Sequence, residues 1–320
     1  MTFYPLQFEP ILKERIWGGE KLKKLLNKPI TSLNTGESWE LSAVEGDVSV
    51  VSKGIWKGKS LMALIQDYPE EILGTVVYAR FGKQFPLLFK YLDAHEDLSI
   101  QVHPNDILAK SRHNSFGKTE MWYVVQADDN AKIIVGFKEK SNPTDYLENL
   151  HNKTLLSILD VVKVQKGEVF FLETGTVHAI GAGLLVAEIQ QTSDITYRLY
   201  DFDRQDANGN KRELHVDLAL EAINYNTIES KREYTKNNNT SNKVVECPYF
   251  TTNFIPLEGE ISVSKSGNSF TVYMCVEGTF ELEYNNSKLL FKKGDTILIP
   301  AALHAFILTG KASILEIYIS

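Results

Sequence analysis

Short stretches of apolar residues, alternating with polar ones or uninterrupted, recur along most of this 320-residue chain. Alternation with a period of two gives a β-strand one apolar face, and a run of about four to eight apolar residues fits a strand buried on both faces. Turn residues separate the stretches. These patterns predict strands at 47–51, 87–92, 121–125, 132–137, 168–172 and 184–190, and a further all-β region between 249 and 319.

Patterns of helical period are fewer. Ser60 precedes the apolar run 61–65, and a serine oxygen at this position can accept a hydrogen bond from a free amide of the first helical turn. The segment 143–159 predicts one or two short helices, and the apolar residues of 214–224 recur near the helical period. The balance favours a mainly β fold with a few peripheral helices.

One long segment, 229–243, is polar and almost without apolar side chains. It cannot bury enough apolar surface to offset the entropy lost on ordering, so we interpret it as a linker. It divides the chain into an N-terminal part, 1–235, which contains the short helical segments, and a C-terminal part, 244–320.

A weak internal repeat supports this division. In the first part, a lysine-glycine-acid turn at 166–168 is followed by a buried strand and by His178-Ala179. In the second part, a similar turn at 293–295 is followed by a buried strand and by His304-Ala305. This order is found in double-stranded β-helix proteins, the cupins. We therefore predict two cupin-like jelly-roll barrels, one in each part.

Charge and the ends of the chain exclude some classes of protein. The formal net charge of −7 argues against nucleic-acid binding, which usually requires a basic face. The N-terminus has no basic region followed by an apolar one, and no apolar run approaches the roughly 20 residues that cross a bilayer. Cys247 and Cys275 indicate no disulfide framework. We expect a soluble cytoplasmic protein that binds neither nucleic acid nor a membrane.

Candidate metal ligands begin on a predicted strand that starts at Ser99 and is ended by Pro104. Gln101 and His103 are two positions apart, so their side chains face the same way, with Ser99 behind them. An amide oxygen and an imidazole nitrogen side by side on a strand can hold a metal ion. Other strands would have to supply the remaining ligands.

Glu120 and His178 are the candidates for those remaining ligands. With them, the set contains two imidazoles, one carboxylate and one amide oxygen. Because it has no sulfur ligand, the set suits zinc, with manganese, cobalt and iron(II) as alternatives. His304 has no such companions, so we predict a metal site in the first barrel and none in the second.

Polar side chains accumulate after the apolar run 184–187. Glu188, Asp194 and Arg198 would fall near one end of the barrel, and the planar guanidinium of Arg198 suits a phosphate or another oxyanion. Lys118 adds a second cation. An ordinary cluster of salt bridges is the alternative interpretation of these residues.

Four motifs in the expected order resemble the type I mannose-6-phosphate isomerases, or phosphomannose isomerases, in their short bacterial form. The motifs are Gln-Val-His-Pro-Asn-Asp at 101–106, Gly-Lys-Thr-Glu-Met-Trp-Tyr at 117–123, Gly-Thr-Val-His-Ala at 175–179 and Ser-Asp-Ile-Thr-Tyr-Arg-Leu-Tyr-Asp-Phe at 193–202. Similar segments occur at 15–19, 36–40 and 85–90. The resemblance spans the chain and is tightest from 85 to 225.

The resemblance implies a zinc-dependent cupin enzyme that interconverts mannose 6-phosphate and fructose 6-phosphate through a cis-enediol(ate), with one zinc ion per chain. It implies zinc ligands at Gln101, His103, Glu120 and His178, active-site cations at Arg198 and Lys118, acidic groups at Asp194 and Glu188, and a pocket serine at Ser99. The general base would be Asp194, Glu188 or a metal-bound water. We expect a monomer that binds a sugar phosphate.

Two other classes stay open. An iron(II) oxygenase of the cupin type would use two histidines and one carboxylate, and a non-catalytic cupin would only bind a sugar. The additional Gln101, together with Arg198 and Lys118, favours a sugar phosphate as the substrate.

Overall fold

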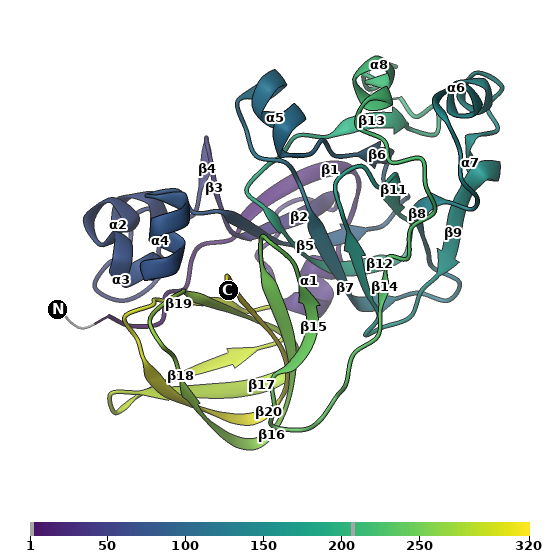
Figure 1. Cartoon of the computed structure of the whole chain (residues 1–320). Helices are drawn as coiled ribbons and strands as arrows, with labels where there is room; N and C mark the ends of the chain where they lie inside the picture. Colours follow the sequence, from purple (N-terminus) through teal and green to yellow (C-terminus); the bar gives the residue numbers. More distant parts are fainter. Residues whose placement is uncertain (1–2, 206–208) are drawn as a thin grey trace.

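The computed structural model describes residues 3–205 and 209–320, and it is mainly β, as predicted (Figure 1). A seven-stranded antiparallel sheet has the order β1 (Ile11–Gly19), β2 (Thr35–Leu41), β5 (Leu87–Ala94), β12 (Leu184–Gln191), β7 (Glu120–Ala127), β10 (Val169–Leu172) and β14 (Lys231–Arg232). A five-stranded sheet has the order β13 (Tyr197–Tyr200), β6 (Ile100–Val102), β11 (His178–Ile180), β8 (Lys132–Phe137) and β9 (Leu159–Lys163).

The C-terminal region forms a second barrel, at the bottom of Figure 1. Its sheet has the order β15 (Asn242–Glu246), β16 (Thr251–Ser264), β20 (Ala305–Tyr318), β17 (Thr271–Tyr284) and β18 (Ser287–Lys292), and β19 (Thr296–Ile299) pairs with β17. A small hairpin joins β3 (Ala43–Val44) to β4 (Asp47–Val48). The prediction of two jelly-roll barrels is confirmed.

The predicted helices are present, and the cap is as expected. Ser60 accepts a hydrogen bond from the Ala63 amide at the start of α2 (Leu61–Asp67). The segment 143–159 contains α6 (Pro143–His151) and α7 (Leu155–Ile158), and α8 (Val216–Leu220) covers only the middle of 214–224. No described helix is both long enough and apolar enough to cross a bilayer.

Four further helices were not predicted from the sequence: α1 (Lys21–Leu26), α3 (Pro69–Leu73), α4 (Thr75–Phe81) and α5 (Asp106–His113). Helix α4 begins with Thr-Val-Val, β-branched residues that favour strands. Tertiary contacts hold its first turn instead: the Thr75 amide donates to the Gly267 carbonyl at 3.4 Å, and the Val76 amide donates to the Asn268 carbonyl at 3.0 Å.

The polar segment 229–243, interpreted as a linker, leads from the first part of the chain to β15 and also contacts the first part. Lys231 and Arg232 form β14 and pair with β10 of the large sheet. The Tyr234 hydroxyl donates to the Gly167 carbonyl at 2.7 Å. A few backbone and aromatic contacts therefore give this segment the order that its composition does not predict.

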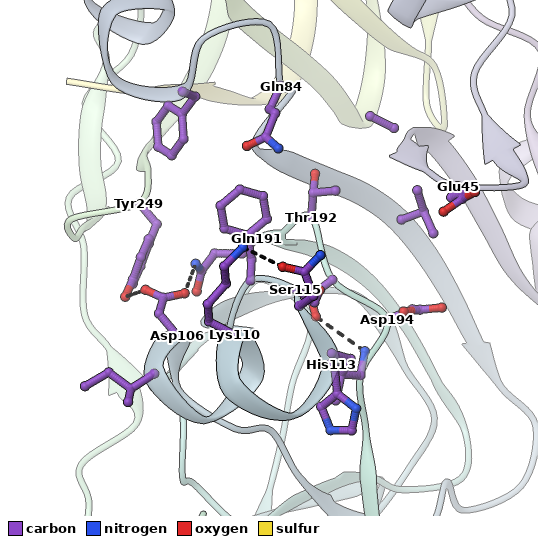
Figure 2. Close-up of a pocket in the computed structure, with 18 of the residues that line it drawn as sticks. Glu45, Gln84, Asp106, Lys110, His113, Ser115, Gln191, Thr192, Asp194 and Tyr249 are labelled. Atoms are coloured by element: carbon purple, nitrogen blue, oxygen red, sulfur yellow. Dashed lines mark hydrogen bonds between the residues drawn. The ribbon is translucent and has the colours of Figure 1, made fainter.

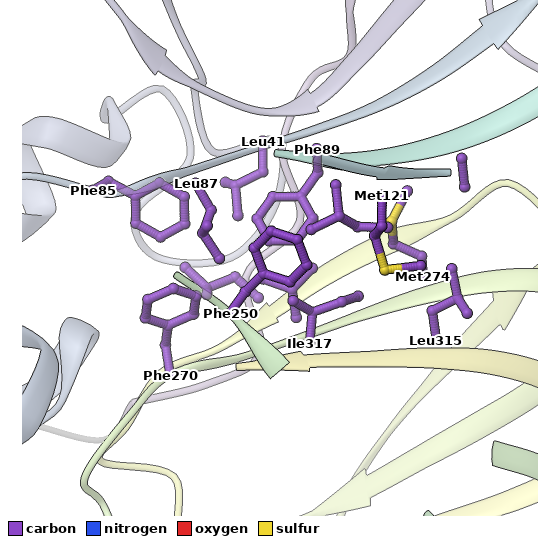
Figure 3. Close-up of a cluster of buried hydrophobic side chains, with 14 of the residues drawn as sticks. Leu41, Phe85, Leu87, Phe89, Met121, Phe250, Phe270, Met274, Leu315 and Ile317 are labelled. Atoms are coloured by element: carbon purple, nitrogen blue, oxygen red, sulfur yellow. The ribbon is translucent and has the colours of Figure 1, made fainter. Parts of the chain in front are cut away.

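The central strands of the seven-stranded sheet are buried on both faces, which explains why most of their residues are apolar. Along β12, Leu185, Ala187 and Ile189 face the C-terminal barrel, whereas Leu184 and Val186 face the five-stranded sheet. The first of these layers also contains Phe250, Phe270, Met274 and Leu315 from the C-terminal barrel and Phe89 and Met121 from the large sheet (Figure 3). The two barrels thus share one apolar core.

The C-terminal barrel also contains a buried carboxylate, Glu316. It accepts hydrogen bonds from Lys265 at 2.6 Å, Tyr273 at 2.9 Å, Asn253 at 2.9 Å and Ser241 at 2.8 Å. Both oxygens are satisfied, so this group is stabilised without a ligand.

Candidate metal centre

Three buried side chains, His103, Glu120 and His178, converge between the two sheets of the first barrel. One ligand atom from each lies within 4.8 Å of the others. The Glu120 carboxylate is 3.7 Å from His103 Nε2 and 3.4 Å from His178 Nε2. Glu120 begins β7, His178 begins β11 and His103 follows the last residue of β6. The three residues are far apart in sequence and meet because the sheets pack face to face.

Main-chain carbonyls orient both imidazoles. His103 Nδ1 lies 2.8 Å from the Ile195 carbonyl, and His178 Nδ1 lies 2.7 Å from the Thr176 carbonyl. A carbonyl only accepts, so each Nδ1 carries the proton and each Nε2 keeps its lone pair. Both lone pairs are on the nitrogens nearest Glu120, which is the tautomer that a metal ion requires.

Gln101 lies beside these three residues. It is directly opposite His178 in the pairing of β6 with β11, and its amide end is 3.3 Å from His178 Nε2. One oxygen of Glu120, Oε1, is fully buried without a hydrogen-bond partner. An unpaired buried polar atom costs about 1–3 kcal/mol, and a cation at this point would remove that cost. The donor set therefore fits a divalent metal ion.

Lys118 lies closer to the ligand atoms than the sequence suggested. Its buried ammonium donates to Glu120 Oε2 at 2.6 Å and to His103 Nε2 at 3.0 Å. Burial alone would lower the pKa of Lys118, but the charges of Glu120 and Glu188 raise it above the usual value. The lysine therefore stays charged, and its ammonium adjoins the candidate metal centre as well as the open cavity described below.

Burial decides the protonation of the three candidate ligands. It lowers the pKa of His178 to about 4, and it lowers the pKa of His103 well below the usual value with a further contribution from Lys118. Both histidines are consequently neutral near neutral pH. Burial raises the pKa of Glu120 to about 7, although the charge of Lys118 opposes the shift. A nearby cation would favour the ionised carboxylate.

A cavity of about 520 Å³ opens next to these residues. Its lining includes six of the residues that the sequence analysis singled out: Ser99, Gln101, Lys118, Glu188, Asp194 and Arg198. His103, Glu120 and His178 are buried and are not part of the lining. The candidate residues thus form one site with a buried part and an open part.

A row of side chains crosses the sheet on the cavity side. Pairing of β2, β5, β12 and β7 aligns Trp39, Lys90, Glu188 and Trp122. Lys90 Nζ is 3.1 Å from one Glu188 oxygen, and Trp122 Nε1 donates to the other at 3.0 Å. Burial would raise the pKa of Glu188, but the charges of Lys118 and Lys90 lower it to about 2. Glu188 is therefore a fixed buried anion.

Arg198 stands opposite Gln101 in the pairing of β13 with β6. Its Nη1 donates to the Glu213 carbonyl at 2.8 Å, and its Nε is buried without a partner. Burial and the nearby charge of Arg212 lower the pKa of Arg198. The guanidinium therefore has unused donor capacity beside the cavity, as expected of a group that binds an oxyanion.

A larger cavity, of about 980 Å³, is lined in part by residues 191–195 (Figure 2). Asp194 is exposed and lines both cavities. The larger cavity includes none of the candidate metal ligands in its lining. We therefore assign the site to the smaller cavity, where the buried charged groups converge.

Sequence reasoning missed several residues of the site: Arg15, Glu37, Trp39, Lys90 and Arg212. Arg15 donates to Glu37 at 2.7 Å, and Arg212 forms an ion pair with Asp201. The sequence does contain a signal for Lys90, because a charged residue inside the apolar run 87–92 must find a buried partner. The others depend on register between distant strands, which a single sequence does not display.

Family models and individual relatives both match this chain to the mannose-6-phosphate isomerases. Residues 6–136 match the model "Phosphomannose isomerase type I, catalytic domain", and residues 240–319 match "Mannose-6-phosphate isomerase, cupin domain". The chain is 40% identical to mannose-6-phosphate isomerase ManA of Bacillus subtilis over 98% of both chains. It is 32% identical to the mannose-6-phosphate isomerase of Streptococcus mutans over 97% of both chains.

Solved structures agree with these relatives. The crystal structure of the mannose 6-phosphate isomerase from Bacillus subtilis superposes with a TM-score of 0.91 at 34% identity, covering 99% of this chain and 100% of the other. A putative mannosephosphate isomerase from Archaeoglobus fulgidus, 24% identical, shares the fold with a TM-score of 0.81, covering 99% of each chain.

Proposed function

This chain belongs to the type I mannose-6-phosphate isomerase family, and from that premise we propose how its residues carry out the interconversion of mannose 6-phosphate and fructose 6-phosphate. The observation that supports the proposal is the convergence of His103, Glu120 and His178 beside a cavity with unused cationic donors. The reaction moves a proton between C1 and C2 and creates negative charge on a sugar oxygen, so both features are needed.

We propose that His103, Glu120, His178 and Gln101 hold one zinc ion. Two neutral imidazoles, a carboxylate and an amide oxygen are hard to borderline ligands, which suits zinc better than a soft metal. When bound, the ion supplies Lewis-acid stabilisation to developing negative charge and orients the sugar oxygens. The chain's own contribution is to keep both imidazoles neutral and correctly turned through the Ile195 and Thr176 carbonyls.

Arg198 and Lys118 would bind the anionic parts of the substrate. The unpartnered Nε of Arg198 supports its role in holding the phosphate or the enediolate oxygen. Lys118 keeps its proton because two carboxylates face it, so it can donate hydrogen bonds throughout the reaction. Binding energy from the phosphate end helps to position C1 and C2. Ser99 lines the same cavity and would contact a sugar hydroxyl.

We propose Glu188 rather than Asp194 as the group that moves the proton. Glu188 is buried on the cavity wall, held ionised by Lys90 and oriented by Trp122. Asp194 is exposed at the rim, where water competes. Glu188→Gln should lower kcat about 100-fold or more, as removal of a general base usually does, whereas Asp194→Asn should change kcat only a few-fold. The reverse order of effects would assign the base to Asp194.

A coupled assay on metal-analysed protein tests the whole proposal. We expect turnover of mannose 6-phosphate in proportion to bound zinc, loss of turnover after chelation, and recovery when zinc is returned. Full activity in protein free of divalent metal would contradict the metal assignment. No turnover in zinc-loaded protein would contradict the assigned reaction.

We further propose that catalysis belongs to residues 1–235 and that 244–320 has no metal site. His304 supports this, because it is exposed in the loop before β20, and the described residues contain no other group of His, Cys, Asp and Glu side chains placed to hold an ion. A stoichiometry of two metal ions per chain would contradict it. The monomeric state stays a prediction, which light scattering would test.

A further inference from the structure

A path of hydrogen bonds leads from the C-terminal barrel to the residues around the metal centre. It begins at Tyr249, in the connection between β15 and β16. The Tyr249 hydroxyl donates to Asp106 Oδ2 at 2.6 Å. Figure 2 shows Tyr249, Asp106 and Gln191 next to one another in the wall of the larger cavity.

Asp106 connects this tyrosine to the first barrel. It is the first residue of α5 and follows His103 by three positions. Its other oxygen, Oδ1, accepts from the Gly117 amide at 2.8 Å and from Gln191 Nε2 at 3.1 Å. The carboxylate therefore ties the C-terminal barrel to two separate segments of the first barrel.

Gln191 completes the path at the residue between Lys118 and Glu120. Its side-chain oxygen accepts from the Thr119 main-chain amide at 2.9 Å, and its main-chain amide donates to the Thr119 carbonyl at 3.1 Å. Gln191 is buried and is the last residue of β12. The backbone on both sides of Lys118 is thus held by side chains, since Asp106 fixes Gly117 and Gln191 fixes Thr119.

This arrangement matters because 117–119 lies before β7 begins and has no strand pairing of its own. The backbone is also tight here: a Cβ on Gly117 would lie 2.7 Å from the Asp106 amide nitrogen. A displacement of about 1 Å in a catalytic group can reduce the rate about 100-fold. Lys118 therefore depends on the hydrogen bonds of its neighbours for its position, whereas Glu120 is held by the pairing of β7 with β10 and β12. Lys118 in turn contacts Glu120 and His103.

We propose that Tyr249 is a positioning residue that the C-terminal barrel contributes to the metal centre, acting through Asp106 and Gln191 on Lys118 and, through the contacts of Lys118, on Glu120 and His103. The inference rests on the proposed function of that centre and extends it by giving the second barrel a role in the reaction. Tyr249 touches neither the metal ligands nor the smaller cavity.

Tyr249→Phe tests the proposal because it removes only the hydroxyl. We expect kcat to fall about tenfold while KM for mannose 6-phosphate changes less than about twofold, since Arg198 on β13 is unaffected. Zinc should leave faster in the presence of a chelator. Tyr234→Phe is the matched control: it also removes one phenol hydrogen bond, to the Gly167 carbonyl within the first part of the chain. It should match the wild-type enzyme in both measurements.

Asp106 variants test whether the effect passes along the proposed path. Asp106→Ala should lower kcat at least as much as Tyr249→Phe, and adding Tyr249→Phe to Asp106→Ala should cause no further loss. Asp106→Asn keeps Oδ1 as an acceptor, so it should restore most of kcat.

Three results would overturn the proposal. In the first, Tyr249→Phe has the kcat and the zinc retention of the wild-type enzyme. In the second, the losses of kcat from Tyr249→Phe and Asp106→Ala multiply in the double variant. In the third, Tyr249→Phe lowers the thermal midpoint and leaves kcat unchanged. Each is measured against an active, zinc-containing wild-type enzyme. If the wild-type enzyme itself fails to isomerise the sugar phosphate, the proposed function has failed and not this inference.

Discussion

Replacing Arg198 with methionine should separate activity from stability. The substitution keeps an unbranched aliphatic side chain on β13 and removes only the guanidinium. A hydrogen bond from a charged group contributes about 1.5–3 kcal/mol. Loss of two such bonds to phosphate or enediolate oxygens therefore weakens transition-state binding by about 3 kcal/mol or more. Since about 1.4 kcal/mol is a factor of ten, kcat/KM should fall at least about 100-fold.

The substitution should cost the folded protein little stability. Methionine removes the hydrogen bond from Nη1 to the Glu213 carbonyl, which is exposed to water and therefore worth only about 1 kcal/mol, but it also removes the buried Nε that has no partner, whose burial costs about 1–3 kcal/mol. It also relieves repulsion from Arg212. We expect the free energy of unfolding to stay the same or to rise by up to about 2 kcal/mol.

Three measurements on the same preparation decide this prediction. A coupled isomerase assay gives kcat/KM, urea denaturation gives the free energy of unfolding, and metal analysis gives the zinc content, which should not change. Arg232→Met is the control, because Arg232 also donates to a main-chain carbonyl, that of Glu229, but lies on β14 outside the cavity. If Arg198→Met loses zinc or more than about 2 kcal/mol of stability, Arg198 is a structural residue.

Three further predictions concern other parts of the molecule. His103→Ala should lose both zinc and turnover, measured by metal analysis and the coupled assay, and retention of either would remove His103 from the ligand set. Burial opposes ionisation of Glu316, but Lys265 and its hydrogen-bond donors hold its pKa below the usual value. Stability should therefore be present above the ordinary glutamate pKa and be lost as pH falls through the lowered one; Glu316→Gln should flatten that part of a urea-denaturation profile between about pH 6 and about pH 3. Phe250→Ala, in the shared apolar core, should cost about 3–5 kcal/mol in urea denaturation, whereas the exposed Leu290→Ala should cost almost nothing.

The elements that the sequence predicted well are those whose pattern reflects local physics. The cap at Ser60 depends on residues three apart, and β12 is apolar because both its faces are buried. Helix α4 could not be predicted, because its β-branched start is overruled by contacts with a loop about 190 residues away along the chain.

The site was predictable in kind but not in arrangement. Gln101 and His103 share a direction by strand period, and their neighbours followed from the family resemblance. The sequence could not reveal that Lys118 donates to Glu120, that Lys90 holds Glu188, or that carbonyls at 176 and 195 set the histidine tautomers. Two of these contacts, Lys90 with Glu188 and His103 with the Ile195 carbonyl, join segments far apart in sequence. The other two join residues two positions apart, but their geometry depends on the folded conformation of the backbone, which the pattern does not display.

The two faces of the large sheet have different roles: alternate residues of the same strands either pack in the apolar core or face the site. On β12 the odd-numbered side chains pack in the apolar layer shared with the second barrel, and the even-numbered side chains, Glu188 among them, face the side of the sheet where the cavity lies. A deletion of one residue within this strand would exchange the two sets, placing a carboxylate in the apolar core and apolar side chains in the cavity. The number of residues within the central strands is therefore constrained from both faces of the sheet at once.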